Sequence, residues 1–147
     1  MPIDNFSEVR NDGRIITKTI TLEKMAKLGW APDLVVQLRW NWNGKRVVKN
    51  YPTGVLGKHL EPHDRVAVIV DESGLQVLDG EGGLVFTVSD RIEVNGNQVR
   101  GAYRWFEPLP KPSASRFGAV LEDPEGRLYQ VEIDVGTGAI SNGRKVR

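Results

Sequence analysis

The residues of this sequence best placed to bind something are aromatic and basic side chains between positions 40 and 51. They are Trp40, Trp42, Lys45, Arg46, Lys49 and Tyr51. If two antiparallel strands carry them, the two tryptophans share one face of a sheet and cations lie across from them. Aromatic rings beside cations hold single-stranded nucleic acid, and exposed tryptophans also fill pockets of partner proteins. The group therefore predicts a ligand or partner site.

The same tryptophans have a second interpretation, as core residues. Val36 and Leu38 precede Trp40 and Trp42 at every second position, so the four side chains share one face of the predicted strand. One face of an antiparallel sheet is normally buried, and large aromatic residues are mostly buried. The lysines would then only cover the rings with their aliphatic stems. The two interpretations differ in whether the tryptophans are exposed.

Two histidines, His59 and His63, are the weak candidates for a metal site. Glu61 and Asp64 lie beside them, and imidazole and carboxylate groups together can bind a divalent metal. Pro62 opposes a helix between the two histidines, and no distant third ligand is indicated. We therefore expect no metal and no other cofactor.

Motifs for catalysis are not apparent in the sequence. The chain has no cysteine, which excludes a thiol nucleophile, a thiolate metal site and disulfides. No serine lies in the Gly-x-Ser-x-Gly pattern of a nucleophile elbow. The glycine-rich segment 79–83 lacks the lysine of a phosphate-binding loop and contains Glu81, so we interpret it as a hairpin turn. We predict that the protein is not an enzyme.

Charge is divided unevenly along the chain, although the net charge is only +1. Residues 1–60 hold ten basic and five acidic residues, whereas residues 61–100 hold three basic and eight acidic ones. A chain this close to neutrality is not a bulk-basic nucleic-acid-binding protein. Oppositely charged surfaces steer protein association. We therefore expect another protein or a second copy of the chain as the partner, with nucleic acid less favoured and no membrane.

Four hairpins are expected to position these residues. The first spans residues 34–51 and turns at Asn43-Gly44, a pair that favours a type I′ turn. Its two-residue loop predicts the pairs Trp42–Lys45, Trp40–Val47, Leu38–Lys49 and Val36–Tyr51. The other hairpins span residues 84–106, 116–135 and 65–78. In the hairpin of residues 84–106, apolar residues would face each other in the pairs Ile92–Val99, Val88–Tyr103 and Phe86–Trp105.

The whole chain favours an all-β fold. Glycine and proline punctuate it every eight to twelve residues, which predicts an antiparallel sandwich or a partly open barrel of about 8–10 short strands built from hairpins. One short helix is expected near residues 21–28, where leucine and methionine follow helical spacing. The length of 147 residues fits a single domain, with the proline-rich segment 107–112 as a candidate hinge between subdomains.

These observations favour a non-enzymatic binding or protein-interaction module of a bacterial kind. One alternative is a β-barrel that binds a small apolar or sugar-like ligand. Another is an OB-like protein that binds single-stranded nucleic acid with the hairpin of residues 40–51. The N-terminal residues contain no apolar segment of a signal peptide, so we expect a cytoplasmic protein unless a leader has been removed.

Overall fold

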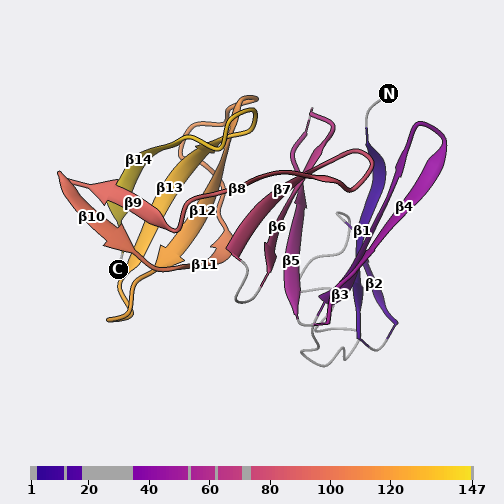
Figure 1. Cartoon of the computed structure of the whole chain (residues 1–147), viewed down its shortest axis with the longest axis horizontal. Coiled ribbons are helices and arrows are strands. Elements are labelled where there is room, and N and C mark those ends of the chain that lie inside the picture. The colour runs from indigo at the N-terminus through magenta and orange to yellow at the C-terminus, as the bar shows by residue number, and fades with distance from the viewer. Residues whose placement is uncertain are drawn as a thin grey trace.

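The computed structural model describes residues 3–11, 13–17, 35–52, 54–61, 63–70 and 74–146. These residues form fourteen β-strands in four antiparallel sheets, with no helix and no closed barrel among them (Figure 1). The predicted all-β antiparallel fold is confirmed. The helix expected near residues 21–28 lies outside the described residues.

Two sheets form the N-terminal and middle layers. The N-terminal sheet has the order β2-β1-β3-β4, and the middle sheet has the order β5-β6-β7-β8. The N-terminal strands are β1 (Asp4–Arg10), β2 (Ile15–Thr17), β3 (Val35–Trp42) and β4 (Lys45–Asn50). The middle strands are β5 (Val55–His59), β6 (Arg65–Val70), β7 (Gly74–Asp79) and β8 (Leu84–Thr87).

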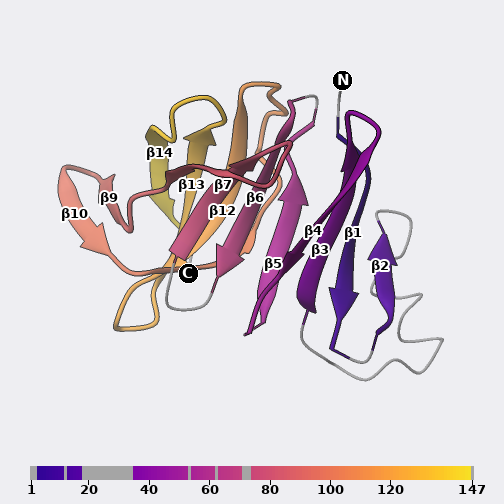
Figure 2. The same ribbon diagram turned by 45° about the vertical axis from the view of Figure 1, so that its right-hand side comes forward.

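The C-terminal sheet forms the third layer and has the order β11-β12-β13-β14. Its strands are β11 (Ala102–Phe106), β12 (Arg116–Glu122), β13 (Leu128–Asp134) and β14 (Ile140–Lys145). A separate hairpin of β9 (Arg91–Val94) and β10 (Asn97–Arg100) lies beside β14. Figure 2 shows that the middle sheet lies between the N-terminal sheet and the C-terminal sheet.

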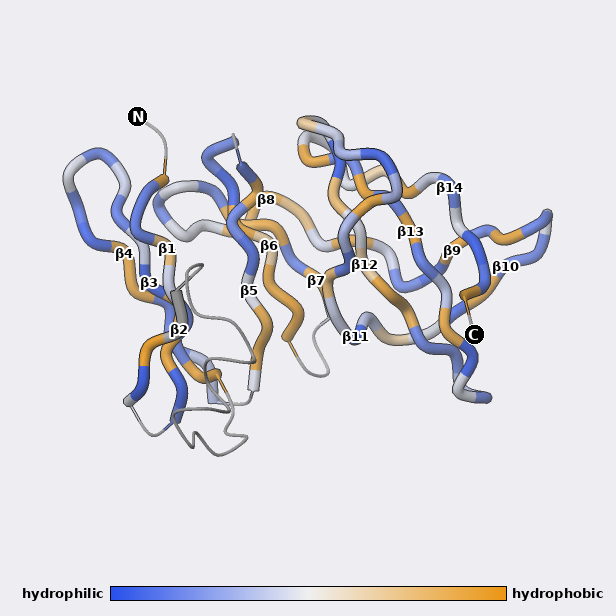
Figure 3. Tube along the Cα trace, turned by 180° about the vertical axis from the view of Figure 1, so that it is seen from behind, coloured by the Kyte–Doolittle hydropathy of each residue, from blue (hydrophilic) through white to orange (hydrophobic). Residues whose placement is uncertain are grey.

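The middle sheet contributes one face to each of two hydrophobic cores. Its strand β6 places Val66 and Val68 in the N-terminal core, and Ala67 and Ile69 in the C-terminal core. A strand buried on both faces is apolar at successive positions instead of alternating ones. This explains why β6 is hydrophobic along most of its length (Figure 3). The fold is therefore a stack of three sheets around two cores.

A half-buried carboxylate links the N-terminal and middle layers. Glu8 of β1 accepts a hydrogen bond from the backbone N–H of Gly57 on the edge strand β5, at 3.1 Å. Burial raises the pKa of Glu8, and the hydrogen bond from Gly57 offsets part of that rise. A Cβ at Gly57 would lie 2.7 Å from a Leu38 methyl carbon, so only glycine permits the close approach of β5 to Leu38.

The long hairpin predicted for residues 84–106 is wrong beyond its tip. Ile92 does pair with Val99, but β8 pairs with β7 and β11 pairs with β12. The predicted partners of Val88 and Phe86 on the returning strand are therefore not their partners. Strand β8 buries its apolar residues by joining the middle sheet, and β11 does so by joining the C-terminal sheet, which buries them better than pairing the two strands with each other would. This splitting of one hairpin helps to raise the strand count from the expected 8–10 to fourteen.

The remaining hairpins agree with the prediction. Strand β12 pairs with β13 across the turn at residues 123–126, and β6 pairs with β7 across residues 71–73, which lie outside the described ranges. The proline-rich segment 107–112 joins β11 to β12, two neighbouring strands of one sheet. Motion about this segment, and with it the single-domain assignment, stays a prediction. The described residues contain no helix that could cross a membrane.

Candidate functional site

Strands β3 and β4 form the hairpin that carries the predicted site residues. Asn43 and Gly44 at its tip have φ angles of 50° and 74°, the positive values that a type I′ turn requires. The predicted register is confirmed by the Cα partners Trp42–Lys45, Trp40–Val47 and Leu38–Lys49, and by a hydrogen bond from the Tyr51 N–H to the Val36 carbonyl. The hairpin thus has an inner face toward the middle sheet and an outer face.

Trp40 is a residue of the N-terminal core. Its side chain is 1% exposed, and its indole N–H donates a hydrogen bond to the Gly80 carbonyl at 2.7 Å. The ring of Phe6 packs beside it, with centroids 6.3 Å apart. A ligand cannot reach this ring without opening the core. Of the two interpretations of Trp40, the core one therefore applies.

Trp42 is half-buried against the turn between β7 and β8. A Cβ built on Gly80 would lie 2.4–2.6 Å from three atoms of the indole, so the ring lies directly on the glycine backbone. Its indole N–H is buried and has no hydrogen-bond partner within the described part of the chain. Trp40 and Trp42 do not form an exposed aromatic pair.

The other predicted site residues divide into a covered and an exposed group. Lys49 lays its stem over the same turn, with its Cδ 3.1 Å from the Cβ position of Gly82. Tyr51 packs against the N-terminal core, and burial raises the pKa of its hydroxyl. Lys45 and Arg46 are exposed near the hairpin tip. The structure therefore covers the aromatic residues and Lys49 of the predicted site and exposes Lys45 and Arg46.

The outer face of the hairpin adds two residues to Lys45 and Arg46. Val48 is 41% exposed, and Arg39 is its Cα partner on β3. The guanidinium of Arg39 donates a hydrogen bond to the neutral side chain of Gln37, so its charge is not compensated there. Sequence alternation had placed both residues on the polar face but did not mark them as a site. Lys49 is the Cα partner of the core residue Leu38, so it belongs to the inner face. We name the basic hairpin surface for Arg39, Arg46 and Val48 on the outer face and Lys45 at the tip.

The cations of the basic hairpin surface form no ion pair within the described residues. Strands β3 and β4 contain no acidic residue at all. In the C-terminal sheet and the β9–β10 hairpin, Arg144 bonds to the neutral side chain of Gln130 and Arg91 forms no ion pair among the described residues, but four other arginines of this region have carboxylate partners. These pairs are Arg100–Asp90, Arg104–Glu122, Arg116–Glu132 and Arg127–Asp123. The basic hairpin surface thus carries uncompensated positive charge.

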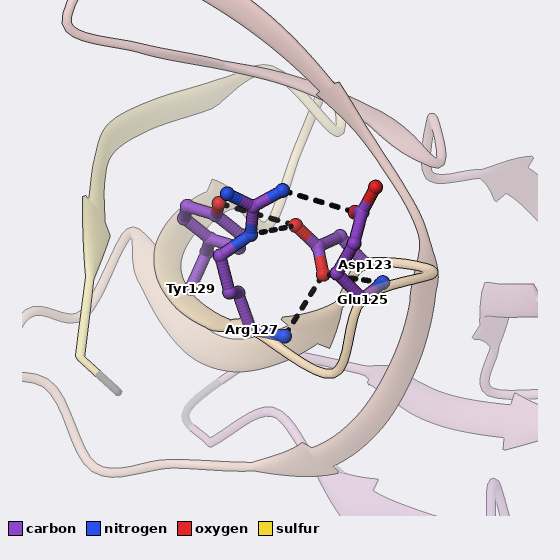
Figure 4. Close-up of polar contacts among 4 residues, drawn as sticks. All are labelled: Asp123, Glu125, Arg127 and Tyr129. Carbon is purple, nitrogen blue, oxygen red and sulfur yellow. Dashed lines mark hydrogen bonds and ion pairs between the residues drawn. The ribbon is translucent and has the colours of Figure 1, made fainter.

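A second group of polar side chains surrounds Asp123, after β12 (Figure 4). One carboxylate oxygen accepts hydrogen bonds from the backbone N–H groups of Glu125 and Arg127, and the other accepts from Arg127 Nε at 2.9 Å and the Tyr129 hydroxyl at 3.3 Å. Burial works to raise the pKa of Asp123, but these hydrogen bonds and the charge of Arg127 hold it below its usual value. The group holds a turn closed.

A cleft lies between this turn and the β9–β10 hairpin. Its volume is about 520 Å³, and its lining includes Asn95, Gln98, Arg100 and Arg127. Both arginines are already paired with carboxylates. The cleft therefore offers less free charge than the basic hairpin surface.

The two histidines contact backbone carbonyls. His59 Nε2 lies 3.2 Å from the carbonyl of His63, and His59 Nδ1 lies 3.5 Å from the Glu61 carboxylate. His63 Nε2 contacts the carbonyl of Ala114, which precedes the C-terminal strand β12. Across the described ranges, no three histidine, aspartate or glutamate side chains come together as a metal site would need.

Comparison with known proteins gives one full-length structural match. No family model and no curated protein matches the sequence. The chain is similar to a chain in the solved structure of Tne2 in complex with Tni2, with a TM-score of 0.88 and 29% identity over 99% of both chains. The whole stack of sheets is therefore shared with a protein that was solved as one member of a two-protein complex.

Proposed function

We propose that this protein is a non-enzymatic interaction module that acts by forming a complex with one specific partner protein. The observation that carries the proposal is the full-length similarity to a chain of the Tne2–Tni2 complex. The likeness covers both chains almost completely, so it involves every layer of the fold and not one common motif. A similar chain in a two-protein complex supports the same mode of action here.

The arrangement of polar groups supports this function. The Asp123 carboxylate accepts hydrogen bonds from the backbone N–H groups of Glu125 and Arg127 and from the Arg127 side chain. Hydrogen bonds of this kind close a structural turn. Lys45, Arg46 and Val48 of the basic hairpin surface are exposed, and the Trp40–Gly80 hydrogen bond anchors the hairpin that carries them. Exposed charge on a fixed element suits recognition of another macromolecule.

The two alternative functions have less support. The described strands form open sheets with no closed barrel, and side chains fill the two spaces between layers, so no barrel interior exists for a small ligand. Binding of single-stranded nucleic acid by stacking requires exposed rings. Trp40 lies in the core and Trp42 lies on Gly80, so the hairpin lacks such a platform.

The proposal is tested by mixing the purified chain separately with purified Tne2 and purified Tni2. We expect one of the two to form a stable complex of one copy each, measured by size-exclusion chromatography with light scattering. The chain alone gives the control for self-association. A short single-stranded oligonucleotide and an apolar dye serve as probes for the alternatives. Failure to bind either protein overturns the proposal, and binding of the oligonucleotide or the dye instead identifies which alternative replaces it.

A further inference from the structure

We propose that the basic hairpin surface is the docking site for the partner protein, and that the partner presents an acidic surface to it. This inference rests on the proposed function, because it assumes that the partner is a protein. It adds the place on the fold where the partner binds and the chemistry that recognises it.

The charge of the hairpin determines the chemistry of the partner. Arg39, Lys45 and Arg46 form no ion pair in the described part of the chain, and the two strands that carry them contain no acidic residue. Burying such cations against an apolar or basic surface would remove their hydration without replacing it. Aspartate and glutamate side chains of a partner would supply the missing hydrogen bonds and charge. Arg104 and Arg116 of the C-terminal sheet need no such partner, because they already pair with Glu122 and Glu132.

The shape of the surface also fits a protein interface. Val48, 41% exposed, provides an apolar centre, and Arg39 lies directly across from it. Protein interfaces typically have an apolar centre, a polar rim and an enrichment in arginine. The cations on edge strand β4 also disfavour strand addition by a second copy, because two copies of the same basic edge repel each other. A different, acidic protein is therefore the expected occupant.

The hairpin is held in place before the partner arrives. The Trp40–Gly80 hydrogen bond anchors β3 to the middle sheet, and Trp42 lies on the same glycine. A surface that is already ordered loses less conformational entropy when it binds. The buried aromatic residues thus serve binding indirectly, by positioning the cations.

A charge-reversal experiment tests this inference. The double variant Lys45→Glu/Arg46→Glu changes two exposed residues of the basic hairpin surface. The control Arg91→Glu/Lys111→Glu changes the net charge equally at two exposed residues that form no ion pair in the described structure. The probe is whichever of Tne2 and Tni2 binds the wild-type chain. We expect the hairpin variant to lower the association rate constant about tenfold or more at low salt, and the control to stay near wild type.

The outcomes separate the two proposals. Melting curves first establish that both variants fold. Equal rate constants for the hairpin variant and the control, with the complex still formed, overturn the docking site and leave the proposed function intact. Absence of a complex with the wild-type chain overturns both. Hairpin-dependent binding of an oligonucleotide without hairpin-dependent binding of the protein assigns the surface to nucleic acid and overturns the acidic protein partner.

Discussion

At the scale of residues, three aspartates close the turns that follow β7, β12 and β13. Each accepts hydrogen bonds from backbone N–H groups two to four residues ahead, an arrangement that aspartate favours at turns. These carboxylates belong to Asp79, Asp123 and Asp134. A glycine with positive φ completes each turn, at positions 82, 126 and 138. Short polar contacts of this kind fix the register of the buried strands beside them.

The Asp123→Asn variant tests the charge at one of these turns. The pKa of Asp123 is lowered in the folded protein, so the charged carboxylate stabilises the fold above the unfolded pKa of about 4, and this contribution is lost as the pH falls through the folded pKa. We expect the variant to be less stable than wild type at pH 7 and the difference to close in acid. Urea unfolding at pH 7, 5 and 3 measures it, and a difference as large at pH 3 as at pH 7 would contradict the ionic explanation.

Trp40 gives the largest expected loss of stability from a single side chain. Trp40→Ala should lower the free energy of unfolding by about 3–5 kcal/mol, because it empties a core site and leaves the Gly80 carbonyl without its donor. Val48→Ala on the outer face is the control and should change stability by about 0.5 kcal/mol or less. Denaturant titration measures both. Equal effects of the two substitutions would mean that Trp40 is not a core residue.

At the scale of elements, the pattern of agreement has a physical cause. The β3–β4 hairpin was predictable to the residue, because Asn43-Gly44 fixes the loop length and one face is clearly apolar. The partners of β8 and β11 were not predictable, because any apolar strand satisfies their alternation equally well. Their true partners, β7 and β12, are chosen by burial in sheets that form from distant parts of the chain.

The candidate site was predictable only in part for the same reason. Sequence spacing placed the tryptophans and cations on one hairpin, which is a local property. Whether the rings are exposed depends on the turn at residues 79–83, which covers them from about forty residues away in the chain. No local pattern reports such a contact. The composition did indicate the uncompensated charge, since β3 and β4 lack acidic residues.

Gly80→Ala tests the contact between the turn and the hairpin. The added Cβ would lie 2.4 Å from the Trp42 indole nitrogen, so the ring has to move away from the turn. We expect a lower melting temperature and a shift in tryptophan fluorescence. Gly136→Ala is the control, because Gly136 also lies outside the left-handed region and a Cβ there meets only an Asp134 carboxylate oxygen at 3.3 Å. A fluorescence spectrum and melting temperature that stay unchanged in Gly80→Ala would show that the ring does not rest on Gly80.

At the scale of the whole molecule, the middle sheet makes the two cores depend on each other. Removing either outer layer would expose one apolar face of β6 and β7, which carry Val66, Val68, Leu75 and Val77. The Glu8–Gly57 hydrogen bond joins two of the layers directly. Loss of one core therefore removes the support of the other.

Cooperative unfolding is the expected result. In the variant Trp105→Phe, the remaining tryptophans all belong to residues 1–60, so their fluorescence reports the N-terminal half. Circular dichroism in the far ultraviolet reports all sheets. We expect the two melting curves to coincide, as they do for a single cooperative domain. Two separated transitions would instead support subdomains that unfold independently.

The shared middle sheet also has a consequence during protein synthesis. When the ribosome has added Thr87, the middle sheet is complete, but the residues that cover its second face have not yet been made. The 58 residues from Val88 to Lys145, the end of β14, take about 3–12 s at roughly 5–20 residues per second. For that interval, Ala67, Ile69 and Leu75 lack their partners, so the nascent chain is most exposed to aggregation, and most dependent on chaperones, just before its C-terminal layer emerges.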